Sequence, residues 1–153
     1  MPRLKIRNVN RSDINENLVQ ELVVEKKIFS TIRELLCFAA MLGYSLKKKK
    51  RLPDGKKHDV SYQQFEANDA IDNIYLISVC DTKSTDCLKP DSEVDIVTIF
   101  EEYAHAGLEI IQSWYVKYST QDPQKALILG LYDEKFIDNE QISNEEIKEA
   151  IKF

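Results

Sequence analysis

The sequence predicts a mainly α-helical fold: a single-domain helical bundle with a small β-hairpin around residues 45–65. Of the 153 residues, 43% are hydrophobic and 31% are charged, which is the balance of a globular protein that folds in water. Only 4 glycines and 4 prolines occur, too few for the many tight turns of a β-sandwich. No internal repeat and no linker of biased composition interrupts the chain, so we expect one domain over residues 1–153.

Apolar residues recur at helical spacing along most of the chain, and capping residues mark several helix starts. The predicted helices cover residues 12–27, 31–42, 68–79, 93–118, 122–131 and 143–151. Ser92 is the expected cap of the helix 93–118, whose broad apolar stripe predicts packing on more than one side. Asp122 before Pro123 predicts another capped start, and residues 143–146 have the spacing of a capping box.

The helix 31–42 carries the clearest local signals. Thr31 and Glu34 have the T-x-x-E spacing of a capping box, and Phe29 is placed to pack back onto the first turns. Gly43 follows the last periodic residue, which predicts a left-handed C-terminal cap. In the later helix, Gly107 predicts either a close crossing of two helices or a break.

Two extended segments form the predicted hairpin. Residues 45–52 and 59–65 flank Pro53-Asp54-Gly55, which has turn chemistry, so the lysines would line a two-stranded ribbon. A long loop is the alternative. Residues 1–11 hold basic side chains at near-alternate positions, and we expect a flexible basic arm there, with a short edge strand as the alternative.

The charges divide unevenly along the chain. The net charge is −5, but residues 1–57 carry 14 Lys and Arg against 6 Asp and Glu, whereas residues 58–153 carry 7 against 20. This polarity predicts a basic contact surface on an acidic body. Neutralisation of one half by the other, within the fold or between copies in an oligomer, explains the same pattern.

The cysteines and the hydropathy bear on the compartment. Cys37 and Cys80 lie in apolar helical surroundings and Cys87 in a polar loop, an odd number with no C-x-x-C spacing. We therefore expect no disulfide framework and a reducing, cytoplasmic location. No apolar run is long enough to cross a bilayer, and the N-terminus does not resemble a secretory signal, so no membrane partner is expected.

Catalytic motifs are scarce. The sequence has no glycine-rich phosphate loop, no G-x-S-x-G and no H-E-x-x-H. Glu102 and His105 match the E-x-x-H half-motif of di-iron bundles, but such a site needs a second copy that the sequence lacks. We therefore predict no catalytic residue, no metal and no cofactor. An enzyme built on these two residues, such as a nuclease or a metal-dependent oxidase, is the weakest alternative.

A dense basic cluster is the one positive functional signal. Its members are Lys47, Lys48, Lys49, Lys50, Arg51, Lys56 and Lys57. Such a cluster can neutralise several phosphates and release their counterions. Because it is nearly all lysine, it predicts non-specific contact with the backbone of double-stranded DNA rather than base reading. The alternative is a set of lysines that only protects an exposed strand edge.

Two motifs carry a family resemblance. The run F-A-A-M-L-G at Phe38–Gly43, followed by the basic segment, and the run I-F-E-E-Y-A-H-A-G-L-E-I at Ile99–Ile110 resemble DNA phosphorothioation-associated protein 4, also called Dnd system-associated protein 4. The resemblance covers about residues 28–117. It implies a bacterial cytoplasmic accessory protein encoded beside the machinery that places sulfur in the DNA backbone, or beside the linked restriction genes.

The family motif names no chemistry. Glu101, Glu102, Tyr103 and Gly107 match it and are expected to be structural or to face a partner, whereas His105 stands at a variable position. The leading hypothesis is a non-enzymatic accessory protein of a phage-defence system, which contacts DNA through the basic cluster and proteins of that system through acidic helices. The alternative is a protein-interaction subunit or homo-oligomer that does not bind DNA directly.

Overall fold

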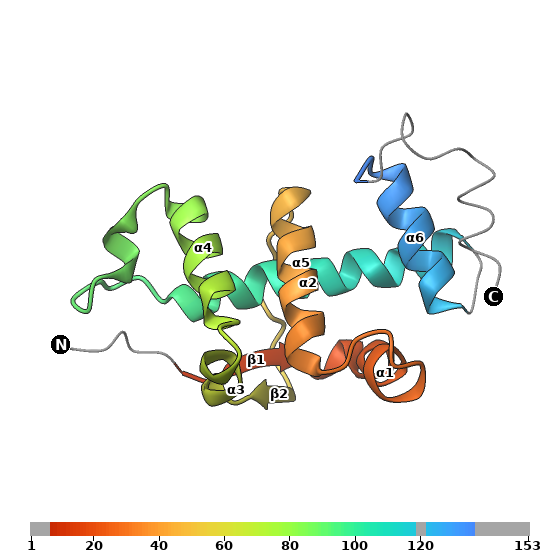
Figure 1. The fold of residues 1–153 in the computed structure, drawn as a ribbon, viewed down its shortest axis with the longest axis horizontal. Coiled ribbons are helices and arrows are strands. Elements are labelled where there is room, and N and C mark those ends of the chain that lie inside the picture. Colours follow the sequence, from red (N-terminus) through yellow and green to blue (C-terminus); the bar gives the residue numbers. More distant parts are fainter. Residues whose placement is uncertain (1–6, 119–121, 137–153) are drawn as a thin grey trace. The chain divides into compact units, whose positions relative to one another are not determined.

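The structure is a computed structural model that describes residues 7–118 and 122–136 (Figure 1). The chain divides into two compact units, residues 1–109 and 110–153. The division falls inside a long helix. That residues 1–153 form a single domain stays a prediction.

The described elements are mostly helical, which confirms the predicted fold class. In chain order they are β1 (Val9–Ser12), a 3₁₀ turn (Asp13–Asn15), α1 (Glu16–Gln20), a π-helical turn (Glu21–Glu25), α2 (Ile32–Ser45), β2 (Lys57–Val60), α3 (Tyr62–Ala67), α4 (Ile71–Thr82), a 3₁₀ turn (Thr85–Leu88), α5 (Ile96–Lys117) and α6 (Pro123–Asp133). The predicted helix 143–151 lies outside the described residues.

The small sheet is antiparallel, as predicted, but its strands come from distant segments. β2 lies within residues 45–65, and its partner is β1, with Val9 opposite Val60 and Ser12 opposite Lys57. The expected partner segment 45–52 is not a strand, because α2 runs through Ser45 and a loop follows. The expected extended segment 59–65 is a strand only as far as Val60, because α3 begins at Tyr62. Pairing follows burial: the side chains of Val9 and Val60 both enter the core.

The strand β1 also corrects the expectation for the N-terminal residues. Val9 and Arg11 are buried and hydrogen-bonded into the sheet, so for these residues the flexible arm is wrong and the edge strand is right. Residues 1–6 lie outside the described part of the chain.

The start of α2 forms as its sequence predicts. The Thr31 hydroxyl accepts the N–H of Glu34 at 3.1 Å, and the Glu34 carboxylate accepts the N–H of Ser30 at 3.0 Å. The Phe29 ring packs against Phe38 with 5.3 Å between ring centroids. Together these contacts fix where the helix begins.

Two glycines allow α2 and α5 to cross closely (Figure 1). A Cβ on Gly43 would lie 2.3 Å from the Tyr103 carbonyl oxygen, and one on Gly107 would lie 1.8 Å from the Ala39 carbonyl oxygen. The crossing predicted as one role of Gly107 is thus confirmed. The C-cap predicted at Gly43 is wrong, because the helix continues past it and the glycine serves the crossing.

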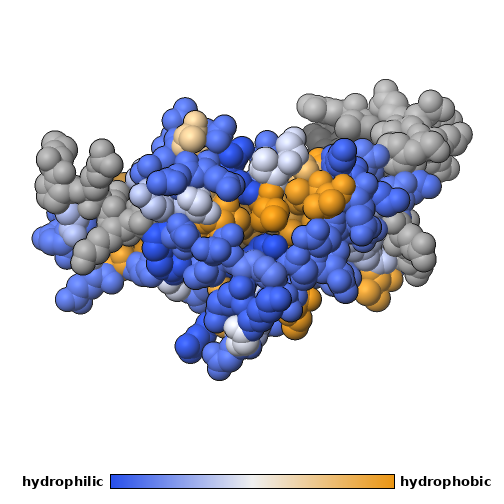
Figure 2. Space-filling view, turned by 90° about the horizontal axis from the view of Figure 1, so that it is seen from below, coloured by the Kyte–Doolittle hydropathy of each residue, from blue (hydrophilic) through white to orange (hydrophobic). Residues whose placement is uncertain are grey.

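The core of residues 7–109 is formed by α2 to α5 together with buried residues of the two strands, of α1 and of the π-helical turn. Phe65 of α3 meets Phe100 of α5 edge to face, at 5.8 Å, and both are fully buried. The cap of α5 is Asp95, whose carboxylate accepts the N–H of Val97 at 3.0 Å, so the predicted cap at Ser92 is three residues early. Figure 2 shows one face of the molecule, on which hydrophilic residues cover most of the surface and hydrophobic ones emerge between them.

In residues 110–136, α6 packs on the end of α5 at a glycine. A Cβ on Gly130 would lie 2.1 Å from the Trp114 ring, so the ring lies directly against the α6 backbone. Asp122 caps α6 as predicted, accepting the N–H of Gln124 at 3.0 Å.

The three cysteines are all free, as expected. Cys37 is half-buried, and burial raises the pKa of its thiol to about 11. The other two exchange their expected surroundings: Cys80 on α4 is exposed, whereas Cys87 is buried by the 3₁₀ turn around it.

Candidate nucleic-acid interface

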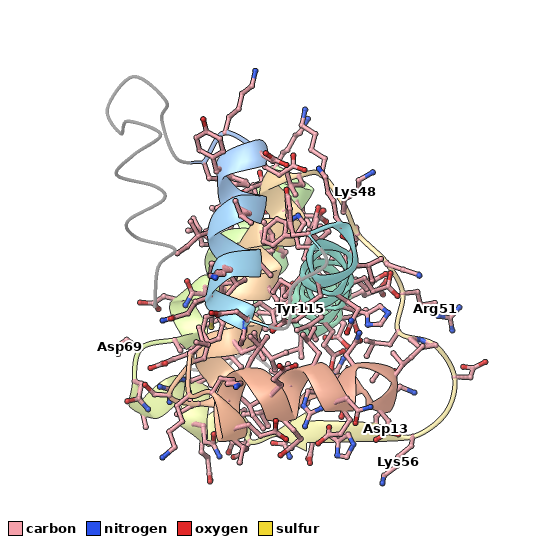
Figure 3. The ribbon with its side chains drawn as sticks, turned by 90° about the vertical axis from the view of Figure 1, so that its right-hand side faces the viewer. Asp13, Lys48, Arg51, Lys56, Asp69 and Tyr115 are labelled. Carbon is pink, nitrogen blue, oxygen red and sulfur yellow. The ribbon has the colours of Figure 1, made fainter. Side chains whose placement is uncertain are left out.

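The predicted basic residues all lie on the segment that joins α2 to β2, residues 46–57, which we call the basic strap. All seven cations are exposed. The strap is a loop up to residue 56 and not the expected ribbon. Figure 3 shows Lys48, Arg51 and Lys56 spread along one edge of the view, pointing outward. The strap therefore offers a row of positive charge rather than a compact cluster.

Backbone hydrogen bonds fix the strap near its start, middle and end. They run from Lys48 N to Gly43 O at 2.8 Å, from Lys50 N to Glu102 O at 3.1 Å, and from Asp13 N to Lys56 O at 3.0 Å. Between the last two, Leu52 is half-buried and lines a small crevice with Leu36, Leu108 and His105. The strap is thus held against the core, although its side chains face solvent.

Two of the seven cations are engaged by carboxylates. Lys49 Nζ lies 3.3 Å from Asp81 Oδ2, and Lys50 Nζ lies 2.9 Å from Glu109 Oε2. The remaining five make no ion pair with any described residue. They are Lys47, Lys48, Arg51, Lys56 and Lys57.

An aromatic pair supports the first of these contacts. The Tyr103 hydroxyl donates to Asp81 Oδ1 at 2.5 Å, and Lys49 Nζ stands 5.5 Å from the centroid of the same ring. Tyr44 packs edge-on against Tyr103 at 5.5 Å. Burial, together with the neighbouring Asp81, raises the pKa of Tyr103, so its hydroxyl keeps the proton that it donates.

Glu101, a carboxylate of the second motif, is buried and fully engaged by hydrogen bonds within the fold. It is 4% exposed and receives both Nη atoms of Arg7, at 2.7 and 2.9 Å, as well as the backbone N–H of Asn10. The hydrogen bond to Glu101 is the main cause that raises the pKa of Arg7. The carboxylate thereby ties the segment leading into β1 to α5. The sequence motif marks Glu101 but not its partners.

His105 is also enclosed. It is 2% exposed, its Nε2 lies 3.4 Å from Glu109 Oε1, and burial lowers its pKa, which favours the neutral imidazole. Among the described residues, no group of three possible metal ligands includes His105 or Glu102. The weak alternative of a metal enzyme at these residues gains no support from the geometry.

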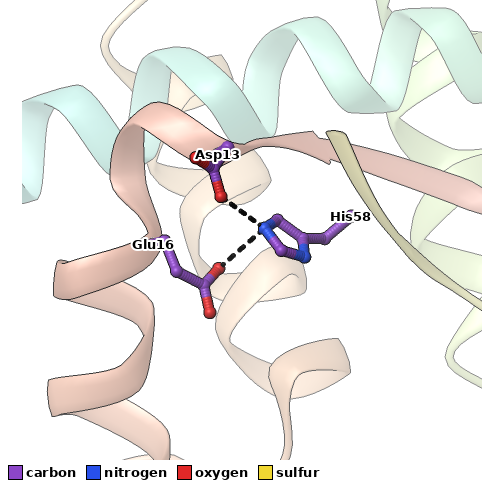
Figure 4. A group of neighbouring side chains, drawn as sticks. All are labelled: Asp13, Glu16 and His58. Carbon is purple, nitrogen blue, oxygen red and sulfur yellow. Dashed lines mark hydrogen bonds and ion pairs between the residues drawn. The ribbon is translucent and has the colours of Figure 1, made fainter. Parts of the chain in front are cut away.

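A different group of possible ligands was not predicted. His58 Nε2 lies 2.6 Å from Asp13 Oδ1 and 3.3 Å from Glu16 Oε2 (Figure 4). The same Glu16 oxygen accepts Arg11 Nη1 at 2.5 Å, so a metal ion bound there would face a guanidinium. The group fits a polar link between β2 and the helical turns after β1 better than it fits a metal site. The pairing of Arg11 with His58 across the sheet brings His58 close to Asp13 and Glu16, which follow β1 in the chain.

Fold and surface together define a small helical protein with one basic edge and, in the part of the chain that the structure describes, no recognisable catalytic constellation. The model of the family DNA sulphur modification system-associated protein 4 matches residues 8–150, and the chain belongs to this family. Membership indicates an accessory protein of a DNA sulphur modification system, with partner proteins of that system.

The match is longer than the resemblance of residues 28–117 and takes in β1 and α6. The two motifs of that resemblance form the α2–α5 crossing, because Ala39 and Gly43 meet Gly107 and Tyr103 there. No curated protein and no solved structure gave a significant match. Among the described residues, no helix has the length and apolar character needed to cross a membrane.

Proposed function

We propose that this accessory protein of a DNA sulphur modification system is non-enzymatic and binds the backbone of double-stranded DNA through the basic strap. The proposal is carried by one observation: five exposed cations without an ion pair among the described residues lie along a strap that backbone hydrogen bonds fix in place. Such cations bind phosphates and release condensed counterions, which is the main source of sequence-independent affinity.

The composition of the strap favours phosphate contact over base recognition. Four of the five unpaired cations are lysines, which are point charges, and only Arg51 offers the fork that reads guanine. Residues 46–57 include no aromatic side chain on which an unpaired base could stack. Duplex DNA of any sequence is therefore the expected ligand, with single strands bound less well.

Fluorescence anisotropy with a labelled duplex tests the proposal. We expect the variant Lys47→Gln, Lys48→Gln, Lys56→Gln to bind roughly 100-fold more weakly at 50 mM salt, since three phosphate contacts are lost. The matched control is Lys26→Gln, Lys27→Gln, Lys83→Gln, which removes the same charge from exposed lysines outside the strap. Lys47 in the strap variant and Lys83 in the control both have a backbone φ of 56°. Each variant therefore includes a substitution at a residue in the left-handed conformation.

The outcome separates the leading function from its alternative. A similar loss in both variants would mean that only net charge matters, and absence of binding by the wild type would overturn DNA contact altogether. In that case the strap would be a site for an acidic protein partner or a second copy of the chain. Size-exclusion chromatography at two salt concentrations would then be the next measurement, because an ionic contact between copies weakens with salt.

A further inference from the structure

We infer that the cations of the basic strap have two different roles, and that Asp81 and Glu109 are positioning residues for the DNA interface. Lys49 and Lys50 hold the strap on the protein, while Lys47, Lys48, Arg51, Lys56 and Lys57 contact phosphates. This inference rests on the proposed function and specifies which part of the strap faces the DNA.

Lys50 is attached to α5 at two points. Its backbone N–H donates to the Glu102 carbonyl at 3.1 Å, and its Nζ donates to both carboxylate oxygens of Glu109, at 3.0 and 2.9 Å. Residues 102 and 109 lie about two helical turns apart, so Lys50 lies lengthwise along the helix. Buried His105 stands 3.4 Å from the same carboxylate and limits its freedom. The side chain of Lys50 is therefore directed along the protein rather than toward a ligand.

Lys49 is attached to two helices. Its Nζ pairs with Asp81 in the last turn of α4 and lies over the ring of Tyr103 on α5. Asp81 is itself fixed by the Tyr103 hydroxyl, and its side chain is 19% exposed. A partly buried carboxylate that is already fixed by a second donor holds a lysine better than a freely exposed carboxylate does. Water screens the ion pair less, and less side-chain entropy is lost when it forms.

The cations on either side of Lys49 and Lys50 make no ion pair with any described residue. Lys48 precedes these two residues and Arg51 follows them, and Figure 3 shows both directed away from the helices. The number of phosphate contacts is therefore five rather than seven. Since each phosphate contact contributes about −0.9 to the slope of log K against log salt concentration, the expected slope is about −4.5, where seven contacts would give about −6.3.

A double-mutant cycle on Lys50 and Glu109 tests the division. We measure the salt slope of duplex binding for the wild type, Lys50→Gln, Glu109→Gln and the double variant. We expect Lys50→Gln alone to leave the slope unchanged. Glu109→Gln releases Lys50 and steepens the slope by about 0.9, and adding Lys50→Gln removes that gain. A role limited to stability would change affinity or folding without this reciprocal change in slope.

Lys48→Gln is the matched control, because it removes an unpaired cation two residues away. It is expected to reduce the magnitude of the slope by about 0.9 in the wild type and in Glu109→Gln alike. If Lys50→Gln reduces the slope of the wild type as Lys48→Gln does, Lys50 contacts phosphate and the inference is overturned. Absence of any duplex binding by the wild type is a different result, since it overturns the proposed function itself.

Discussion

Gly107→Ala is expected to destabilise the protein by about 3 kcal/mol or more, a loss that is large against a total stability of about 5–15 kcal/mol. The new Cβ would lie 1.8 Å from the Ala39 carbonyl oxygen, with the carbonyl carbon and Cα of the same residue at 2.5 and 2.8 Å. All three are backbone atoms, so no rotamer change relieves the contact and α2 must move away from α5. The gain in helix propensity from alanine, about 1 kcal/mol, does not offset this.

Urea denaturation followed by circular dichroism measures the effect. Gln112→Ala is the control, because it places alanine at an exposed position of the same helix and should change the free energy of unfolding very little. Gly43→Ala should also be destabilising, since its Cβ would meet Tyr103 on the other side of the crossing. A Gly107→Ala protein as stable as the wild type would show that the helices do not cross this closely.

Glu101→Ala is expected to cost about 2–3 kcal/mol of folding stability, somewhat less than a fully buried ion pair because Arg7 is partly exposed. The substitution leaves the N–H of Asn10 without its acceptor and removes the buried carboxylate partner of Arg7, whose guanidinium keeps its contacts with Thr98 and Asp95. Glu101→Gln retains the shape and one acceptor oxygen, so its loss should be smaller. The strand β1 should be affected most, because Glu101 is the residue that binds it to α5.

Chemical denaturation and amide hydrogen exchange together test this role. We expect faster exchange at Asn10 and along β1 in both variants, with little change at the α2–α5 crossing. Glu93→Gln, at an exposed glutamate outside any described ion pair, is the control. Equal stability of Glu101→Ala and Glu93→Gln would refute this role of Glu101. Loss of β1 also loosens its partner β2, which carries Lys57, so Glu101 also supports the far end of the basic strap.

Features that depend on neighbouring residues are predictable from the sequence, whereas features that depend on contacts between distant segments are not. The cap at Thr31 and the packing of Phe29 follow from residues next to each other in the chain, and both form as expected. Gly43 predicts a helix end, because a glycine after an apolar stripe is typical of one. The structure instead requires a glycine there because the carbonyl of Tyr103, on another helix, leaves no room for a Cβ. The predicted partner of β2 is wrong for the same reason: a turn at residues 53–55 predicts that the partner is residues 45–52, but burial of Val9 selects β1.

The candidate site likewise has one part that the sequence predicts and one part that only the fold shows. A run of cations is visible in the sequence, and the structure places all of it on the surface. Which cations are held depends on Asp81, 32 residues from Lys49, and on Glu109, 59 residues from Lys50. Their carboxylates sit among other acidic residues with no pattern to distinguish them, so only the folded chain separates the held lysines from the free ones.

The most direct measurement is the affinity of the wild-type protein for two duplexes of unrelated sequence across a salt series. We predict binding at low salt, a slope of log K against log salt concentration of about −4.5, and the same slope for both sequences. Failure to bind either duplex at 50 mM salt, or an affinity that does not change with salt, would contradict a phosphate-contacting strap.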